Sequence, residues 1–297
     1  MSTIQSIAIR RNRRAAYLFL LPNIAGFLVF ILLPVVASLT ISVTDWNGFT
    51  RANFVGVGNF VSMFSSTAFR ISLVNTLTYS LFVVPFTVML SLLVAIMLNS
   101  DLAGLSYFRT AFYLPHISAS VAVAVIWQLI FHPNLGPINS FLMRLGVQNP
   151  PRWFGSSDWA MTGVIVVSIW KRVGYFMVLF LAGLQTIPRQ LYESADIDGA
   201  STIRKLWHIT IPMISPTTFL VTIMATIASF KAFDLIYNLT LGGPGRATNV
   251  LVYTIYQESF QRFRFGYASA IAYFLFAIVL LVTLIQFRIQ KKSVHYY

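Results

Sequence analysis

Long apolar segments separated by shorter polar ones form the main pattern along the chain. The first two, from about Tyr17 to Val43 and from about Ile71 to Asn99, contain no charged residue. Since about 20 apolar residues in a helix cross a bilayer core, each of these segments is long enough to span a membrane. Four later segments are also long and apolar, at about 110–131, 160–185, 215–237 and 266–287, although the second and third of these contain charged residues. The pattern predicts an all-α polytopic membrane protein with six transmembrane helices in one domain over residues 17–288.

A polar insert at residues 186–214 separates the fourth apolar segment from the fifth. It carries three of the eight acidic residues of the chain, Glu193, Asp196 and Asp198. Lipid offers the backbone no hydrogen-bond partners, so a charged, glycine-containing insert should protrude from the bilayer.

The residues of the insert predict two short helices joined at a glycine. Pro188 suits the first turn of a helix, because its missing N–H would have been unpaired there in any case, and the helix should include 192–197. Gly199 accepts the backbone angles that end a helix. Ser201 or Asp198 can cap the second helix, which leads into the fifth span. The alternative is an amphipathic helix that lies on the lipid headgroups.

Composition and charge agree with a membrane protein. Hydrophobic residues make up 57% of the chain and charged residues 10%, against about 25% charged residues in a typical soluble domain. In such a protein the net charge of +13 is explained by the orientation of the chain in the membrane and by contact with lipid headgroups, rather than by a nucleic-acid partner.

The distribution of basic residues predicts the orientation. With six spans, both termini and the insert lie on one side, and this side carries more Lys and Arg than the other. The positive-inside rule then makes three segments cytoplasmic: the basic segment 1–16, the insert 186–214 and the tail 289–297. The first apolar run is longer than the 7–15-residue core of a signal peptide, which favours an uncleaved helix.

The sequence lacks the signatures of a catalytic protein. It contains no Gly-x-x-x-x-Gly-Lys-Ser/Thr pattern, so we expect no ATP hydrolysis by this chain. Eight carboxylates, four histidines and no cysteine offer no evident metal or catalytic cluster. We expect neither an enzyme nor a chain with a cofactor of its own.

Polar residues inside the spans are candidate functional residues, because they are costly in lipid. His116 and Ser120 are one helical turn apart in the third span and should share a face; a lone histidine there can also simply satisfy an interhelical hydrogen bond. The pair Lys171–Arg172 in the fourth span can snorkel, bind a carboxylate of another subunit, or face a cavity and attract an anion. Lys231 and Asp234 in the fifth span are three residues apart and are expected to pair with each other.

The insert carries a motif that identifies a family. Its pattern Glu-x-Ala-x-x-x-Gly, followed ten residues later by Ile-x-Ile-Pro, resembles the EAA motif of the permeases of ABC importers. Ser194 and Ile211 are mild departures from it. The positions that match are Tyr192, Glu193, Ala195, Asp198, Gly199, Ala200, Ile209 and Pro212.

The resemblance extends over nearly the whole chain and is specific for the carbohydrate branch, of the maltose or glycerol-phosphate "first" permease type. The matching segments are Asn75-Thr76, Leu114-Pro115, 136–139, 182–185 and 242–244, with Thr248 and Tyr256.

This resemblance implies a permease subunit in a bacterial inner membrane that imports a sugar by alternating access. Its implied partners are a second permease that completes a heterodimer, two ATPase subunits that carry ATP and Mg, and an extracytoplasmic binding protein. The ATPases would act through the EAA motif. The resemblance also places substrate contacts at seven positions: His116, Ser120, Ser168, Trp170, Arg172, Tyr175 and Ser229.

Two alternatives remain open on the residues alone. Lys171 and Arg172 support an importer of the same build for a phosphorylated or uronate substrate. A self-sufficient secondary transporter would need coupling carboxylates inside the spans, and Asp234 is the one such residue.

Overall fold

The computed structural model describes residues 17–100 and 104–293. Within these ranges the chain is helical, apart from turns and one isolated antiparallel bridge between Thr44 and Phe54. The predicted all-α class is confirmed. The chain divides into two compact units: one contains the residues before Phe64 together with Glu258–Tyr273, and the other contains Phe64–Gln257 and the residues from Phe274 on. Helix α15 (Phe265–Ser293) begins in the first unit and continues into the second.

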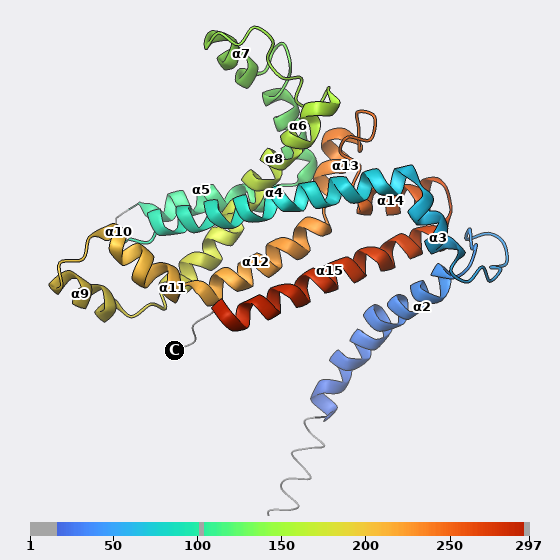
Figure 1. Cartoon of the computed structure of the whole chain (residues 1–297), viewed down its shortest axis with the longest axis horizontal. Coiled ribbons are helices and arrows are strands. Elements are labelled where there is room, and N and C mark those ends of the chain that lie inside the picture. Colours follow the sequence, from blue (N-terminus) through green and yellow to red (C-terminus); the bar gives the residue numbers. More distant parts are fainter. Residues whose placement is uncertain (1–16, 101–103, 294–297) are drawn as a thin grey trace, which may run out of the picture. The chain divides into compact units, whose positions relative to one another are not determined.

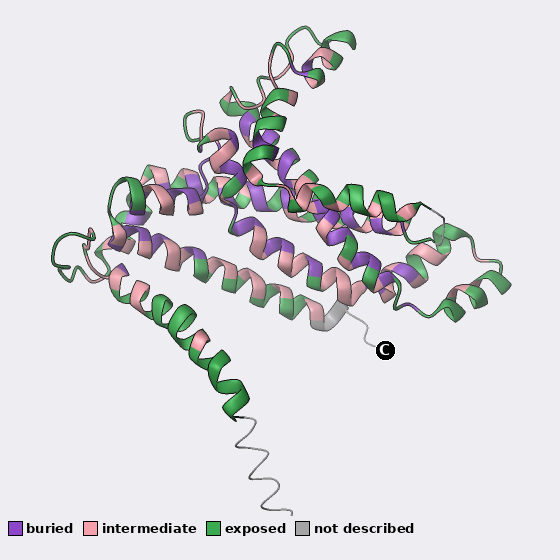
Figure 2. Cartoon of the chain, turned by 180° about the vertical axis from the view of Figure 1, so that it is seen from behind, coloured by how far each residue is buried: buried purple, intermediate pink, exposed green. Residues whose placement is uncertain are grey.

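The first unit starts with a 26-residue helix, Tyr17–Ser42, in which a π-helical turn (η1, Leu28–Leu32) precedes α2 (Leu33–Ser42). The most apolar window of this helix has no buried residue, and Figure 2 shows the helix mostly exposed, with half-buried residues toward its C-terminal end. The unit also contains most of α3 (Gly58–Ser65) and of the π-helical turn η3 (Gln257–Gln261).

Side-chain hydrogen bonds fix the segment that follows α2. The Asn59 amide donates to the carbonyl oxygens of Ser42 and Thr44, at 2.9 and 2.7 Å. Asn53 donates from its backbone and its side chain to the Asp45 carboxylate, and these bonds lower the pKa of Asp45. In the same unit the buried carboxylate of Glu258 forms ion pairs with Arg262 and Arg264.

The second unit holds the remaining helices, drawn in Figure 1. In chain order they are α4 (Thr67–Met97), α5 (Leu105–Ile117), α6 (Ser120–Ile130), α7 (Pro137–Arg144), α8 (Ser157–Leu184), α9 (Arg189–Ile197), α10 (Thr202–Lys205), the π-helical turn η2 (Leu206–Thr210), α11 (Ile211–Met213), α12 (Ser215–Phe230), α13 (Asp234–Thr240) and α14 (Leu251–Tyr256).

Helices α4, α8 and α12 pack against one another in the second unit, and α5 packs against α8. The buried side of α4 carries small hydroxyl residues, which allow close approach of helices in a membrane. Ser91 donates to the carbonyl oxygen of Val173 on α8 (3.0 Å), and Ser80 accepts from Ser229 on α12 (2.9 Å). Exposed residues recur along α4, whereas the residues of α12 are nearly all buried or half-buried (Figure 2).

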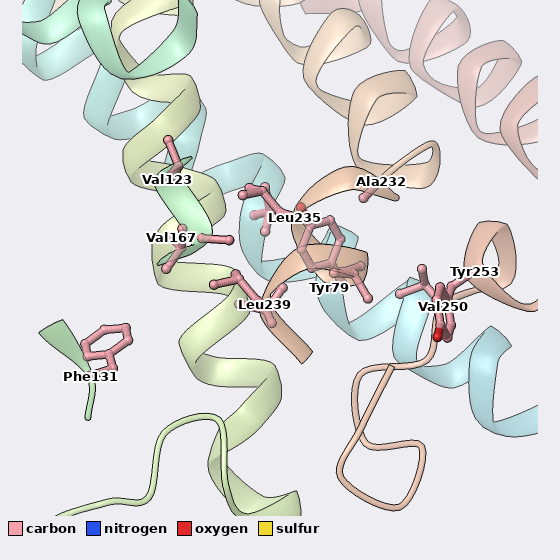
Figure 3. Close-up of a cluster of buried hydrophobic side chains, with 13 residues drawn as sticks. Tyr79, Val123, Phe131, Val167, Ala232, Leu235, Leu239, Val250 and Tyr253 are labelled. Carbon is pink, nitrogen blue, oxygen red and sulfur yellow. The ribbon is translucent and has the colours of Figure 1, made fainter. Parts of the chain in front are cut away.

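Two apolar clusters fill the second unit. One combines residues of α4, α6, α8 and α13 with Phe131 and Tyr253, and Figure 3 shows its labelled members. The other lies among the C-terminal part of α4, the second half of α8 and α12, with Phe180 and Met177 fully buried. The polar insert follows α8 directly, so this second cluster supports its base.

The helix lengths agree with the predicted spans in four places. The helices Tyr17–Ser42, Thr67–Met97, Ser157–Leu184 and Phe265–Gln290 are long and apolar enough to cross a membrane. Two bent pairs of helices bring the number to six if each pair counts as one span. Of the predicted terminal segments, 1–16 lies outside the described residues, and α15 extends through the first five residues of 289–297.

The expected continuous third span is wrong. The chain bends by 101° between α5 and α6, because Ser118 and Ala119 adopt extended backbone angles with ψ of 141° and 132°. Pro115 lacks an N–H and so weakens the last turn of α5. His116 and Ser120 therefore lie on two different helices, not on one face of a single helix.

The expected fifth span also ends early. Helix α12 stops at Phe230, and a non-helical segment leads to Asp234, the first residue of α13. The ion pairs among the described residues do not include one between Lys231 and Asp234. Their expected pairing assumed helical spacing, which the break removes, and Asp234 instead occupies the favourable first turn of a new helix.

The contact between α5 and α8 depends on Gly174. A Cβ atom there would lie 1.8 Å from the carbonyl oxygen of Phe112 and 2.9 Å from Cα of Tyr113. We expect Gly174→Ala to force the two helices apart and to destabilise the fold by about 1–3 kcal/mol, as overpacking does elsewhere. Thermal unfolding of the purified protein in detergent measures this. Gly26→Ala is the matched control, because no heavy atom lies within 4 Å of its Cβ position; equal melting temperatures for both variants would contradict the prediction.

Candidate functional site

The first half of the polar insert is the predicted short helix. Pro188 is the residue before α9, not a residue of its first turn as expected. Gly199 follows the helix with a φ of +70°, a left-handed conformation that glycine adopts without strain. The backbone N–H of Ala200 donates to the carbonyl oxygen of Ala195 at 2.8 Å, which closes the turn. The predicted helix–glycine–helix arrangement is confirmed.

Two side-chain contacts tie the second half of the insert to the first. The Lys205 ammonium lies 2.6 Å from the Asp196 carboxylate, and the hydroxyls of Tyr192 and Thr210 are 2.9 Å apart. Ser201 caps the second helix, since its Oγ accepts a hydrogen bond at 3.4 Å from the backbone N–H three residues later. Because Thr210 is buried, the Tyr192 contact anchors α9 to the base of the insert.

The outer surface of the insert is apolar as well as charged. Ile197, Ile203 and Trp207 expose 88%, 70% and 62% of their surface. Exposed large apolar side chains grouped on a protrusion are typical of a surface that binds a partner. Of the predicted coupling residues, Glu193, Asp198 and Gly199 are exposed, whereas Ala195, Ala200, Ile209 and Pro212 are half-buried.

A polar pocket lies where the two broken spans meet α4 and α8 in the second unit. Its volume is about 410 Å³, and it contains residues from both breaks. Three cations and one carboxylate are among its lining residues. Its polar lining includes His116, Ser120, Lys171, Arg172, Lys231 and Asp234.

Lys171 bridges the break in the third span. Its ammonium donates to the carbonyl oxygen of Ser118 at 3.1 Å and to the hydroxyl of Ser120 at 2.7 Å. The ammonium thus satisfies a carbonyl that lies between α5 and α6, where the helical hydrogen bonds stop.

The predicted substrate contacts fall into two groups. His116, Ser120 and Arg172 line the polar pocket, and Tyr175 stacks on the His116 ring with a centroid distance of 4.5 Å. The other three lie elsewhere: Trp170 lines an apolar hollow with Phe112 and Pro115, Ser168 is fully buried, and Ser229 bonds Ser80.

Most lining residues of the pocket were not among the predicted substrate contacts, including the polar residues Lys231, Asp234 and Tyr79. Lys231 and Asp234 line the pocket because the fifth span is broken, whereas an unbroken helix would have paired them with each other. Tyr79 is 1% exposed, and its hydroxyl is buried without a hydrogen-bond partner. A tyrosine within an apolar span gives no signal of its own in the sequence.

Over residues 17–100 and 104–293, no group of three or more His, Cys, Asp or Glu side chains could hold a metal ion. Hydroxyls, aromatic rings and an excess of cations can hold a polar or anionic solute.

Comparison with known proteins gives the family. The model of the family "Binding-protein-dependent transport system inner membrane component" matches residues 58–295. The probable ABC transporter permease protein YesP of Bacillus subtilis (strain 168) is 38% identical over 296 residues, which cover 98% of this chain and 95% of that protein. The sn-glycerol-3-phosphate transport system permease protein UgpA of Agrobacterium fabrum (strain C58) is 33% identical over 287 residues, covering 96% and 97%.

The fold has a solved counterpart. A chain in the crystal structure of a bacterial ABC transporter involved in the import of the acidic polysaccharide alginate superposes with a TM-score of 0.83 at 26% sequence identity. The similarity covers 97% of this chain and 99% of that one. Family, sequence and fold thus agree over nearly the full length, and this chain belongs to the binding-protein-dependent transport system inner membrane components: it is a multi-pass permease subunit of a bacterial ABC importer, not its ATPase.

Proposed function

We propose that this permease subunit translocates a sugar or oligosaccharide into the cytoplasm by alternating access. The observation that carries the proposal is the polar pocket at the two helix breaks, with a volume of about 410 Å³. Small-molecule sites usually occupy about 300–1,000 Å³. The pocket-lining ring of His116, on which Tyr175 stacks, and the hydroxyl of Ser120 give a flat ring surface and hydrogen-bonding groups that suit a sugar.

ATP hydrolysis drives this cycle through the polar insert. Glu193 and the exposed apolar residues of the insert dock on an ATPase subunit, and Gly199 permits the sharp turn between the two helices. The contacts Lys205–Asp196 and Tyr192–Thr210 make the insert rigid enough to pass movement to the spans. In this topology the insert and both termini are cytoplasmic, as the distribution of basic residues favours.

The working complex contains further subunits. A second permease completes the pathway as a heterodimer, two ATPase subunits bind ATP and Mg, and an extracytoplasmic binding protein delivers the substrate. The solved alginate transporter, 26% identical to this chain, was also determined with a periplasmic protein bound to an alginate pentasaccharide, which supports such an assembly.

The second candidate is the same importer for an anionic sugar derivative or a glycerol phosphate. Lys171, Arg172 and Lys231 outnumber Asp234 around the pocket, which favours an anion. Relatives named for sn-glycerol-3-phosphate and a structural neighbour that imports an acidic polysaccharide are in keeping with it. An autonomous secondary transporter has less support, because Asp234 lies at a helix break and has no second carboxylate beside it in the pocket.

Purification tests the assembly. We expect the tagged chain, extracted from its native membrane in mild detergent, to carry a P-loop ATPase and a second six-helix permease, identified by mass spectrometry. A chain that emerges alone, and transports a sugar when reconstituted alone, would exclude the importer.

Substitutions in the insert test the coupling. Glu193→Lys reverses an exposed charge, and Gly199→Pro imposes a negative φ where the backbone has +70°. Both variants should insert at normal levels yet abolish ATP-dependent uptake of the sugar that the binding protein recognises, measured in proteoliposomes of the complete transporter.

A matched control separates coupling from general damage. Gly146 also has a positive φ, +92°, and open space around its Cβ position, but it follows α7. Gly146→Pro should keep ATP-dependent uptake. Normal uptake by both insert variants would show that the insert does not couple the ATPases to transport.

A further inference from the structure

Two cations adjacent in sequence have different surroundings in the polar pocket. The Lys171 ammonium is already engaged, with the carbonyl oxygen of Ser118 and the hydroxyl of Ser120. The guanidinium of Arg172 reaches the same pocket, and its buried Nη1 has no hydrogen-bond partner. The ammonium of Lys171 is therefore occupied by groups of the protein, whereas the guanidinium of Arg172 retains an N–H donor that no protein group within the described residues accepts.

A second unsatisfied group lies in the same pocket. The side chain of Tyr79 is 1% exposed, and its buried hydroxyl has no hydrogen-bond partner. Buried polar groups are nearly always hydrogen-bonded, and an unsatisfied one is expensive. Two such groups that line one pocket, Arg172 on α8 and Tyr79 on α4, indicate a ligand that both of them contact.

The donor chemistry narrows the class of ligand. A guanidinium only donates hydrogen bonds and keeps its charge, and a phenol can donate one more. A neutral sugar hydroxyl could satisfy Tyr79 but would leave the charge of Arg172 uncompensated. A carboxylate or a phosphate accepts from both and matches the fork of the guanidinium.

We propose that Arg172 and Tyr79 form an anion subsite that binds the carboxylate or phosphate group of a carbohydrate-type substrate, whereas Lys171 only positions the broken third span. The inference rests on the proposed function, since it assigns the substrate class of the same pocket. Lys231 and Asp234 are exposed residues of this pocket, so they are available to solvent and are not required by the subsite.

Three probes test the subsite on the complete transporter in lipid nanodiscs, by titration calorimetry without the binding protein. Methyl β-D-glucuronoside presents a carboxylate, sn-glycerol 3-phosphate presents a phosphate, and methyl β-D-glucoside is neutral. We expect one of the two anions to bind at least about tenfold more tightly than the glucoside, as a charge-assisted bond gives. The tighter anion identifies whether the subsite takes a carboxylate or a phosphate.

Variants assign this preference to residues. Arg172→Gln should bring the ratio of anion to glucoside affinity close to one, and Tyr79→Phe should lower anion affinity a few-fold. Arg144→Gln removes an exposed charge at the end of α7, outside the pocket, and is the matched control, with a ratio that stays within about twofold of wild type. Lys171→Met should lower the melting temperature of the protein and leave the ratio of anion to glucoside affinity unchanged.

The outcomes are separable. The subsite is overturned if neither anion binds at about 10 mM. It is also overturned if Arg172→Gln leaves the ratio of anion to glucoside affinity unchanged. Dissociation of the second permease on Arg172→Gln without any anion binding also overturns it, because Arg172 would then pair with a carboxylate of that subunit. If ATP-dependent sugar uptake persists in any of these cases, the proposed importer function is still supported. Failure to recover an ATPase with the chain would instead refute the proposed function itself.

Discussion

Satisfaction of backbone polar groups inside a membrane-length helix is the constraint on which the rest of the structure depends. In lipid a span that breaks must find new partners for the carbonyls that it frees. The third span breaks at Ser118 and Ala119, and Lys171 of α8 supplies the missing donor. The charge that looks most costly in the fourth span is thus used to make the break possible. The break in turn opens the space in which His116 and Arg172 reach a common pocket.

Helix α4 turns its hydroxyl residues toward the inside of the second unit. Helix α4 presents serines and threonines to its neighbours and leucine, phenylalanine and methionine to the outside. Hydroxyls such as that of Ser91 bond backbone carbonyls across helices, and glycine at position 174 lets α5 approach α8 closely. Close packing of backbones replaces the hydrophobic effect, which has little to offer between helices in lipid.

Structural features that depend on residues close together in the sequence were predicted correctly. The unbroken spans followed from their apolar length, and the insert followed from Gly199 and Ser201, whose backbone preferences act within a few residues. The breaks were missed, because apolar character continues through them and only Pro115 weakens the first. The pairing of Lys231 with Asp234 failed for the same reason. The pocket itself could not be predicted, since Tyr79 joins it only through the packing of α4 on distant segments.

The exposed surface of the insert has a consequence for how much of this protein a cell keeps. Ile197, Ile203 and Trp207 face outward on a segment that protrudes from the apolar spans. Under the proposed docking, a copy without its ATPase leaves these apolar side chains uncovered, and an exposed apolar patch promotes aggregation. The proposed docking would therefore link the amount of usable subunit to the supply of the ATPase that covers this surface.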